Sequence, residues 1–443
     1  MARLFGTDGI RGVANVDLKP NLAYALGRAT AHQLVGPDGT LIVGQDTRRS
    51  GDMFVAAITA GATSLGSDVH VVGVVPTPAL AFLTRSGPHA AGIMVSASHN
   101  PADDNGLKVL DADGLKLEDA VEDELEQLIW REGELGGLHN GGIGRRVDAT
   151  ADVATYRAHR TGMAATIPAR GLRIVLDGAN GSGARIGTEV LGATGATVEA
   201  INVEPDGVNI NVRCGATDPG QLAEVVVERG ADLGFALDGD ADRLIAVDAT
   251  GAVVDGDQVL GILALERLRR DALPGGLVVS ILSNGGLQSA IEAAGGQVVR
   301  TPVGDKYILD GMQVSGATLG GEKSGHVIIL EHTTSGDGIV TALEVLRVMC
   351  ARGASLAELA AAIPLLPQQQ RAITARHKDQ WEGDRVLGKA IADANARLAG
   401  AGRIVVRPSG TEPALRVMVE GPDRDLVQEL ADTLATVAGE RLN

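Results

Sequence analysis

The amino-acid sequence predicts an α/β protein with three α/β domains and a smaller C-terminal α+β domain. Three observations lead to this prediction. Short β-branched runs alternate with Ala- and Leu-rich stretches along most of the chain, which is typical of βαβ units with mixed or mostly parallel sheets. The pattern changes after Pro364 and Pro367. A chain of 443 residues is also too long for one compact core.

The elements follow from the apolar runs and the turns between them. We expect four domains, at residues 1–150, 151–250, 251–365 and 366–443, with the Gly-rich segment 132–144 crossing from the first to the second. The last domain has the pattern of a strand, a helix near residues 378–399 and two further strands at 404–406 and 415–419. Further strands are expected at residues 41–43, 69–75, 93–95, 172–176 and 277–281, and helices at 53–65, 222–229 and 285–294.

Composition narrows the class of protein. The chain has 39 Lys and Arg against 56 Asp and Glu, a formal net charge of −17, so we do not expect a general nucleic-acid-binding protein. Two cysteines, Cys214 and Cys350, are too few for a disulfide framework and fit a reducing cytoplasm. No apolar signal core and no apolar run of about 18 residues occurs, so we expect a cytoplasmic protein without a membrane span.

A serine follows the apolar strand at residues 93–95, in the segment SASHNP at 96–101. Ligands of parallel α/β sheets gather beyond the carboxyl ends of the strands, so Ser98 is expected to face a cleft. Its hydroxyl could accept and donate a phosphoryl group if cations or a metal neutralise the charge. Taken alone, the segment also fits an ordinary turn, and a histidine such as His99 is more often structural than catalytic.

Three alternating carboxylates, Asp238, Asp240 and Asp242, end another apolar run in ALDGDADR at 236–243. In an extended segment they would lie on one side, and they would repel one another unless a hard cation lay among them. Oxygen ligands and an open position for a phosphate favour Mg²⁺. A solvated acidic turn and a structural calcium loop are the alternatives, although the Gly and the distal Glu of an EF-hand are not in place.

A third segment, GGEKSGH at 320–326, offers polar side chains between glycines. Glu322, Ser324 and Gly325 are candidates for contact with sugar hydroxyls. His326 is a candidate for proton transfer, because the pKa of histidine lies near neutrality. A plain connecting loop is the alternative.

The fourth segment, RPSGTEP at 407–413, lies between two strand-like runs. An arginine, two hydroxyls and a glycine that lets the backbone approach a ligand form a phosphate cradle, and an ordinary turn is the alternative. A weaker signal is GTDGIRG at 6–12, which places Arg11 on a Gly-rich segment. The residues of the cradle are Arg407, Ser409, Gly410 and Thr411, followed by Arg416.

The four strong segments occur in chain order, one in each predicted domain, and phosphoryl transfer explains all of them. Together they resemble the motifs of the α-D-phosphohexomutase superfamily from Gly6 to Arg416. The segments GTDGIRG at 6–12, SASHNP at 96–101, VGDKY at 303–307, GGEKSGH at 320–326 and TSGDGIV at 334–340 resemble its bacterial phosphoglucosamine mutase branch. Lys323 departs from that branch, which often has Gln there.

The resemblance implies three related α/β domains and a mobile fourth domain around a central cleft. It implies a phosphoserine at Ser98 and one Mg²⁺ held by Asp238, Asp240, Asp242 and an oxygen of that phosphoserine. Sugar hydroxyls would contact Glu322, Ser324 and Gly325, and the non-reacting phosphate would contact the cradle and Arg416. The catalytic candidates besides Ser98 are Arg11, His99, Lys108 in the segment NGLK, Arg243 and His326.

The resemblance also implies an isomerase that interconverts glucosamine 6-phosphate and glucosamine 1-phosphate. A sugar 1,6-bisphosphate would be its intermediate and activator, and its product would supply amino-sugar and cell-wall precursors. The expected partner is a small phosphosugar, and the resemblance makes a homodimer plausible. The alternatives are a phosphoglucomutase or phosphomannomutase, a Mg²⁺ phosphatase that uses Asp238 as nucleophile, and a non-catalytic sugar-phosphate sensor.

Overall fold

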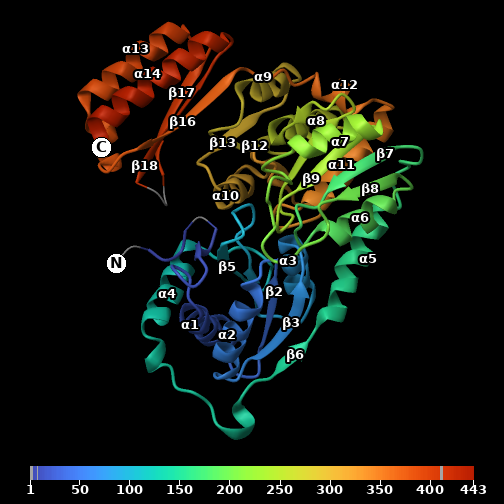
Figure 1. The fold of residues 1–443 in the computed structure, drawn as a ribbon, viewed down its shortest axis with the longest axis vertical. Coiled ribbons are helices and arrows are strands. Elements are labelled where there is room, and N and C mark those ends of the chain that lie inside the picture. The colour runs from blue at the N-terminus through green and yellow to red at the C-terminus, as the bar shows by residue number, and fades with distance from the viewer. Residues whose placement is uncertain (1–2, 7, 410–412) are drawn as a thin grey trace.

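The structure is a computed structural model that describes residues 3–6, 8–409 and 413–443. Its described part consists of four successive units, each built around one sheet, and Figure 1 shows the last unit standing apart at one end of a curved body. The first three units have mixed sheets with helices, and the fourth has an antiparallel sheet packed against two helices. The predicted fold class is therefore confirmed. Among the described residues, no helix is long and apolar enough to span a membrane.

The first sheet lies between two layers of helix. β5 runs antiparallel to β1 and β4, and the other described pairs are parallel. Leu41 and Val43 of β2 face one core and Ile42 faces another, because successive strand side chains point to opposite faces. The strand order is β1 (Ile10–Val13), β5 (Asp104–Leu110), β4 (Ala91–Val95), β2 (Thr40–Gln45), β3 (Asp68–Val74) and β6 (Arg146–Asp148).

Helices cover both faces of this sheet, which explains why its strands are apolar runs rather than alternating ones. One face packs against α1 (Pro20–Thr30), α2 (Gly51–Thr63) and α4 (Asp119–Trp130). The other face packs against α3 (Thr77–Ser86) and α5 (Val153–Ala164). The Gly-rich segment contains two short 3₁₀ turns, Glu132–Glu134 and Asn140–Gly142, before β6 returns to the sheet.

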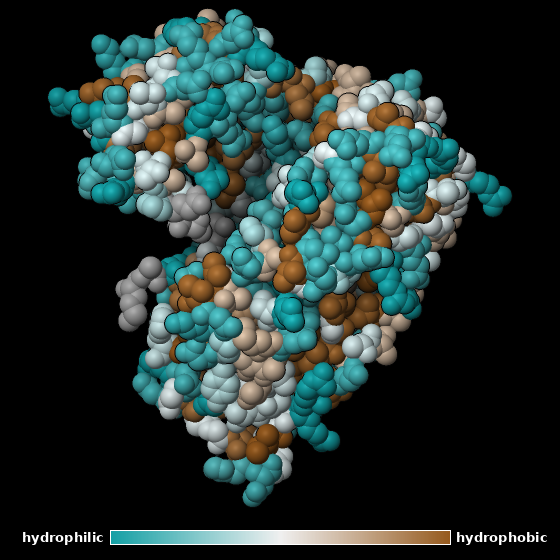
Figure 2. All heavy atoms as spheres, in the orientation of Figure 1, coloured by the Kyte–Doolittle hydropathy of each residue, from teal (hydrophilic) through white to brown (hydrophobic). Residues whose placement is uncertain are grey.

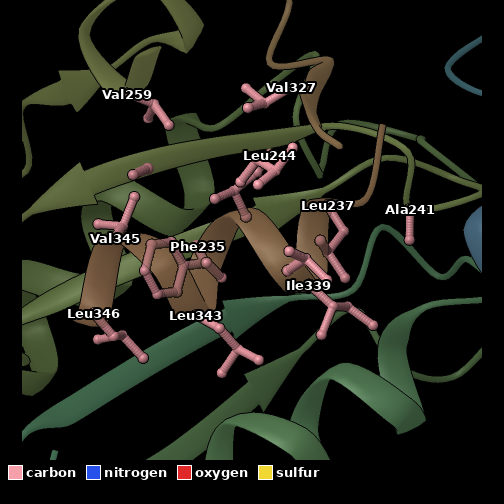
Figure 3. Packing of buried hydrophobic residues seen from close by; sticks show 14 of the residues in the cluster. Phe235, Leu237, Ala241, Leu244, Val259, Val327, Ile339, Leu343, Val345 and Leu346 are labelled. Atoms are coloured by element: carbon pink, nitrogen blue, oxygen red, sulfur yellow. The ribbon is translucent and has the colours of Figure 1, made fainter. Parts of the chain in front are cut away.

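One hydrophobic core joins the second and third units. Phe235 and Leu237 of β9 pack near Ile339 and Leu343 of α11, as Figure 3 shows, although the predicted boundary at residue 250 separates them. Full burial of each such side chain contributes about 1.5–3 kcal/mol. The second sheet has the order β11 (Val253–Val254), β10 (Leu244–Asp248), β9 (Leu233–Leu237), β7 (Arg173–Asp177) and β8 (Thr197–Ile201), with α6 (Ala184–Gly192) and α7 (Gly220–Arg229).

The third sheet is the smaller partner in this core. Its strand order is β13 (Val298–Thr301), β12 (Leu277–Ser280), β14 (Leu319–Gly321) and β15 (Val327–Ile329). Its helices are α8 (Gly256–Arg269), α9 (Gly285–Ala293), α10 (Asp305–Ser315), α11 (Gly338–Arg352) and α12 (Leu356–Ala360). The strand β11 lies just beyond residue 250 and still pairs with β10 of the second sheet. The domain boundary at residue 250 stays a prediction.

The fourth unit differs from the prediction in one respect. The helix expected over residues 378–399 is divided into a 3₁₀ segment, Lys378–Gly383, and α13 (Arg385–Leu398). The division falls at Asp384, whose carboxylate caps α13 by accepting the N–H groups of Val386 and Leu387 at 3.0 and 2.9 Å. The sheet has the order β16 (Gln368–Thr374), β18 (Ala414–Glu420) and β17 (Arg403–Pro408), and α14 (Arg424–Leu442) ends the unit.

Candidate active site

Ser98 lies where β4 leaves the centre of the first sheet. All of β4 is buried, and Ser98 is 1% exposed. Its backbone has a φ of 51°, a left-handed conformation that costs an L-residue about 1–2 kcal/mol. Its N–H donates to Ser96 Oγ at 2.9 Å. Its hydroxyl leaves the first unit and donates to Asp238 Oδ2 at 2.5 Å, across 140 residues of sequence.

The three predicted carboxylates meet at this serine. Asp238, Asp240 and Asp242 each offer an oxygen within 4.8 Å of the others, and all three are buried. They lie on the loop between β9 and β10, which is a turn rather than the extended segment that the sequence suggested. Ala241 has a left-handed φ of 57° in this turn, and the turn brings the carboxylates together.

The electrostatics of the three carboxylates fit a bound cation. Burial and the charges of Asp242 and Asp240 raise the pKa of Asp238 well above its usual value. Burial would also raise the pKa of Asp242, but His326, Lys108 and Arg243 hold it below its usual value. One buried oxygen each of Asp240 and Asp242 has no hydrogen-bond partner. Such oxygens fit the oxygen-only coordination that a hard divalent cation prefers.

Lys108 of β5 lies against the same carboxylates. Its Nζ is 2.9 Å from Asp240 Oδ2, 3.1 Å from Asp8 Oδ2 and 3.8 Å from Asp242 Oδ2, and its side chain is 2% exposed. Burial alone would lower the pKa of Lys108, but Asp240 and Asp8 raise it. The ammonium is therefore a fixed positive charge beside the carboxylates, as a site that receives phosphate requires.

Arg11 contacts the serine loop, residues 96–103 between β4 and β5, and His99 lies within it. The guanidinium of Arg11 donates to Asn100 Oδ1 at 3.1 Å and also contacts Asp8. His99 Nδ1 is 3.4 Å from Ser98 Oγ. Burial, together with the charges of Arg243 and Arg11, lowers the pKa of His99 to about 4, so its imidazole is neutral near pH 7.

Arg243 and His326 come from the second and third units and meet in a β-bridge. Arg243 Nε lies 3.8 Å from Asp242 Oδ1, and its backbone N–H donates to Asp238 Oδ1 at 3.2 Å. His326 Nδ1 lies 3.6 Å from Asp242 Oδ2. Burial lowers the pKa of His326, but Asp242 outweighs that effect and raises it. The structure thus brings all six catalytic candidates and the three carboxylates into one cluster, which is buried except for the partly exposed Arg11, His99 and Arg243.

Four residues of this cluster were not predicted from the sequence. Lys116 Nζ contacts both Asp8 and Asp305, so it joins the first and third units beside His326. Thr77, at the start of α3, donates its hydroxyl to Asp240 Oδ2 at 2.6 Å. Asp8 and Asp305 lie inside the segments GTDGIRG and VGDKY. Lys116 and Thr77 carry no comparable local signal, because their role depends on what packs against them.

The predicted sugar loop follows β14. The Glu322 N–H donates to His326 O at 2.9 Å, and Glu322 Oε1 accepts the Gly304 N–H at 3.1 Å. Gly325 has a φ of 91°, and a Cβ there would lie 2.3 Å from Leu244 O, so the close approach to β10 requires glycine. Ser324 Oγ is buried and has no hydrogen-bond partner. The loop therefore presents a carboxylate and an unsatisfied hydroxyl.

The predicted phosphate cradle lies on the hairpin of β17 and β18, where Arg407 and Arg416 are directly opposite each other. Burial and the charge of Arg416 lower the pKa of Arg407, and its buried Nε has no hydrogen-bond partner. Ser409 is 4% exposed, and its N–H donates to Ala414 O at 2.8 Å. Two paired cations fit an anionic ligand. Gly410 and Thr411, the other predicted cradle residues, lie outside the described residues.

Glu322 connects the two sides of the site. Its charge helps to raise the pKa of Arg243, and it partly offsets the burial and the charge of Arg416 that lower the pKa of Arg407 in the C-terminal unit. Figure 2 shows the surface hollowed between the C-terminal and N-terminal units. A cleft with one buried nucleophile and a remote pair of arginines suits a ligand that carries a phosphate at some distance from its reacting end.

Comparison with protein-family models identifies this arrangement. Models of phosphoglucomutase/phosphomannomutase α/β/α domains I, II and III match residues 2–135, 154–251 and 255–365, and the model of the C-terminal domain matches residues 370–437. The chain belongs to the phosphoglucomutase/phosphomannomutase family.

Family members of high similarity share one name. The phosphoglucosamine mutase of Moorella thermoacetica is 50% identical over 442 residues, and the alignment covers 99% of both chains. That of Carboxydothermus hydrogenoformans is 46% identical over 442 residues, again with 99% of both chains covered. The predicted resemblance to this branch of the phosphoglucomutase/phosphomannomutase family is therefore confirmed.

Solved structures of the family have the same fold. A phosphoglucomutase/phosphomannomutase family protein of Burkholderia thailandensis superposes with a TM-score of 0.81 at 24% identity, covering 100% of this chain and 99% of its own. Aspergillus fumigatus N-acetylphosphoglucosamine mutase, in complex with GlcNAc-6P and magnesium, has a TM-score of 0.69 at 20% identity, with 100% and 96% covered. At these identities the likeness shows the fold alone.

Proposed function

We propose that this protein is a phosphoglucosamine mutase, which interconverts glucosamine 6-phosphate and glucosamine 1-phosphate through a phosphoserine at residue 98. The observation that carries the proposal is the contact of Ser98 Oγ with Asp238 Oδ2 at 2.5 Å, inside a trio of buried carboxylates. Full-length relatives that are 44–50% identical and bear the name phosphoglucosamine mutase support the substrate.

The carboxylate trio fits Mg²⁺. Asp238, Asp240, Asp242 and an oxygen of phosphorylated Ser98 would hold the ion, because the trio supplies only oxygen and keeps buried oxygens without partners. When bound, Mg²⁺ would supply positive charge to the transferring phosphoryl group. Lys108 and Arg243 add fixed positive charge from the protein itself.

The reaction needs two phosphoryl transfers at Ser98. In the first, the bond from Ser98 Oγ to phosphorus breaks while the C1 hydroxyl of glucosamine 6-phosphate forms a new bond to that phosphorus. The hydroxyl proton passes to a cleft base, and Ser98 Oγ ends as a hydroxyl. In the second, the bond from O6 of the resulting 1,6-bisphosphate to phosphorus breaks while Ser98 Oγ bonds to that phosphorus. Ser98 gives up its proton to a cleft base, O6 takes up a proton, and glucosamine 1-phosphate leaves. The candidates for handling these protons and charges are Arg11, His99, Lys108, Arg243 and His326.

The bisphosphate must turn around between the two transfers, so the remote binding groups must accept either end. We propose that Glu322, Ser324 and Gly325 bind sugar hydroxyls, since the loop offers a carboxylate and a hydroxyl without a partner. We propose that the cradle binds the non-reacting phosphate. Positioning of this kind supplies much of the catalysis in phosphoryl transfer. The cradle residues are Arg407, Ser409, Gly410, Thr411 and Arg416.

Three further proposals rest on the resemblance. The reaction would supply the precursor of UDP-N-acetylglucosamine and of peptidoglycan, the protein would be cytoplasmic, and it would form a homodimer. The domain boundaries at residues 150, 250 and 365 likewise stay predictions.

The first test is a coupled assay for glucosamine 1-phosphate with Mg²⁺ and a trace of sugar 1,6-bisphosphate. We expect glucosamine 6-phosphate to react faster than the glucose and mannose 6-phosphates. Comparable turnover of glucose or mannose phosphate would keep the mechanism and overturn the substrate.

The second test is Ser98→Ala. We expect turnover to fall by at least about 10⁴-fold with the fold retained, because the carrier of the phosphoryl group is lost. Circular dichroism and melting temperature check the fold. Appreciable mutase activity in the variant, or phosphate trapped on Asp238 instead of on serine, would contradict the proposal.

A further inference from the structure

Arg48 reaches the serine loop from the segment that follows β2. Its side chain is 0% exposed, and it forms an ion pair with Asp46 through Nε at 2.9 Å. Its remaining donors go to main-chain oxygens of the serine loop. Nη2 donates to Ser98 O at 3.0 Å and to Asn100 O at 2.9 Å, and Nη1 donates to Pro101 O and, at 2.9 Å, to Asp104 O. One guanidinium thus binds three carbonyls of the serine loop and the carbonyl of Asp104, where β5 begins.

This arrangement is suited to arginine alone. A planar guanidinium has five N–H donors in a fixed fork, whereas an ammonium is a single point with three. The Asp46 carboxylate also accepts the Ser96 hydroxyl at 2.7 Å, and Ser96 Oγ accepts the Ser98 N–H at 2.9 Å. The main chain of Ser98 is therefore held on both sides, at its N–H through Ser96 and Asp46 and at its carbonyl by Arg48.

Asn211 holds the same loop from the second unit. Its Nδ2 donates to Ser98 O at 2.9 Å and to Asn100 O at 3.1 Å, and its own N–H donates to Ala179 O at 3.0 Å. Gly239, between two of the carboxylates, approaches the same carbonyl so closely that a Cβ there would lie 2.7 Å from Ser98 O. The Ser98 carbonyl is thus one of the points where the first unit contacts the second.

These contacts maintain an otherwise unfavourable conformation. The left-handed φ of 51° at Ser98 costs about 1–2 kcal/mol and persists only where neighbours over-determine it. Relaxation of this φ would swing Oγ away from Asp238. We infer that Arg48 and Asn211 are positioning residues, which hold Ser98 in the strained conformation that aims its hydroxyl at the carboxylate trio. The inference rests on the proposed function of Ser98.

Asn211→Gly tests the inference with the least disturbance. Glycine accepts the positive φ of 59° at this position, so the variant removes the two hydrogen bonds without new backbone strain. The matched control is Asn202→Gly in the same unit, which has a φ of 52° and whose amide contacts Asp177 and Gln221 but not the serine loop.

The measurement is the single-turnover rate at which glucose 1,6-bisphosphate phosphorylates Ser98, followed by intact-protein mass spectrometry. We expect Asn211→Gly to lower this rate and kcat about 10- to 100-fold, because a misplaced nucleophile loses that much rate. We expect KM for the sugar phosphate to change less than about twofold, since the sugar loop and cradle are untouched. Asn202→Gly is expected to keep the wild-type rate.

Arg48→Lys is the second variant, and Arg28→Lys is its control. Arg28 is a buried arginine of the same unit that donates to Leu135 O and to Ser64 Oγ at 2.7 Å, away from Ser98. We expect both variants to lower the melting temperature, and Arg48→Lys alone to slow phosphorylation of Ser98. If Arg48→Lys does not fold, Asn211→Gly still decides the inference.

The outcomes separate the inference from the proposed function. Loss of phosphorylation in Ser98→Ala, with a wild-type rate in Asn211→Gly, would overturn the positioning role and keep the function. Phosphoryl transfer that survives Ser98→Ala would overturn the function itself. Equal slowing by Asn211→Gly and Asn202→Gly would show a general structural effect and also overturn the positioning role.

Discussion

Two buried carboxylate oxygens distinguish the carboxylate trio from an ordinary acidic turn. Asp240 Oδ1 and Asp242 Oδ1 are buried without hydrogen-bond partners, and an unsatisfied buried charged oxygen costs more than about 1–3 kcal/mol. Lys108 compensates part of the charge, at 2.9 Å from the other oxygen of Asp240. A divalent cation would satisfy the rest, so its binding should stabilise the folded protein.

We expect Mg²⁺ to raise the melting temperature of the wild-type protein. Binding to the folded state adds RT ln(1 + [L]/Kd), or about 2.7 kcal/mol at 100 times Kd. Asp240→Asn should lose most of this shift, because it removes one charged ligand. Asp248→Asn, at the end of the neighbouring strand β10, should keep the shift. Thermal melts with EDTA or Mg²⁺ measure both variants, and an equal shift in the two would contradict the predicted site.

The identity of these residues could be predicted from sequence, but their conformation could not. The spacing of Asp238, Asp240 and Asp242 suggested one side of an extended segment, whereas the residues meet in a turn with Ala241 at a φ of 57°. The left-handed φ of 51° at Ser98 is likewise not a conformation that serine favours by itself. Both conformations persist because contacts with other units outweigh the propensity of the residue.

At the scale of elements, α8 and α9 meet at a buried carboxylate. Asp257, in the first turn of α8, accepts the N–H of Asn284 at 2.8 Å, and Asn284 caps α9. Burial and the charge of Asp255 raise the pKa of Asp257 to about 7. The folded state thus holds a proton that the unfolded chain releases near pH 4. Stability contributed by this proton is lost as the pH rises from about 4 to 7.

Asp257→Asn should remove this pH dependence. The amide oxygen can still accept the Asn284 N–H, and no charge is buried at high pH. We expect the free energy of unfolding at pH 8 to rise by up to about 4 kcal/mol, the upper limit for a shift of about 3 pKa units, and to change little at pH 4. Denaturant unfolding at pH 4, 6 and 8 measures the effect.

Asp271→Asn, an exposed carboxylate beyond the end of α8, is the control and should change the free energy by less than about 0.5 kcal/mol at each pH. The prediction is contradicted if the difference in the free energy of unfolding between Asp257→Asn and the wild type does not grow with pH. The ionised carboxylate of Asp257 would then not destabilise the folded protein.

Elements with a strong periodic pattern were predicted well. The apolar runs at residues 41–43 and 93–95 lie in β2 and β4, and the run at 277–281 lies in β12 except for Ile281, because strand alternation and burial are local properties of sequence. The helix at 378–399 was predicted as one element and is two, because Asp384 favours a cap over a helix interior. The pairing of β5 antiparallel to β1 and β4 has no local signal.

At the scale of the whole molecule, an ion pair between β17 and β18 of the C-terminal unit also hydrogen-bonds to the third unit. Glu420 is 1% exposed and accepts N–H groups of Arg403 at 2.9 Å, Gly285 at 3.0 Å and Gln368 at 3.1 Å. Arg403 also donates to Ile281 O at 2.6 Å. Since Arg407 and Arg416 lie on the same sheet, these contacts help to fix where the predicted phosphate cradle stands relative to the predicted sugar loop.

Glu420→Ala should loosen the C-terminal unit. Breaking a buried pair costs about 3–5 kcal/mol, so we expect faster hydrogen exchange at residues 364–368 and a KM at least about 10-fold higher. Phosphorylation of Ser98 should slow much less once the sugar bisphosphate is saturating. Glu429→Ala is the matched control, since its pair with Arg397 is exposed and contributes little to stability. Unchanged hydrogen exchange at residues 364–368 in Glu420→Ala would show that Glu420 does not hold the C-terminal unit against the third unit.

The sequence alone determined the α/β class, the order of the units and most residues of the candidate site. These follow from periodicity, strand ends and short motifs, all of which involve neighbours in the chain. Only the tertiary structure decided that Ser98 meets Asp238 across 140 residues, that Lys116 joins Asp8 to Asp305, and that Arg48 holds the serine loop. Such contacts arise because separate sheets pack against one another and bring charged residues that are distant in the sequence into one buried region. Each buried charge there needs a partner, and local propensity does not determine which one it meets.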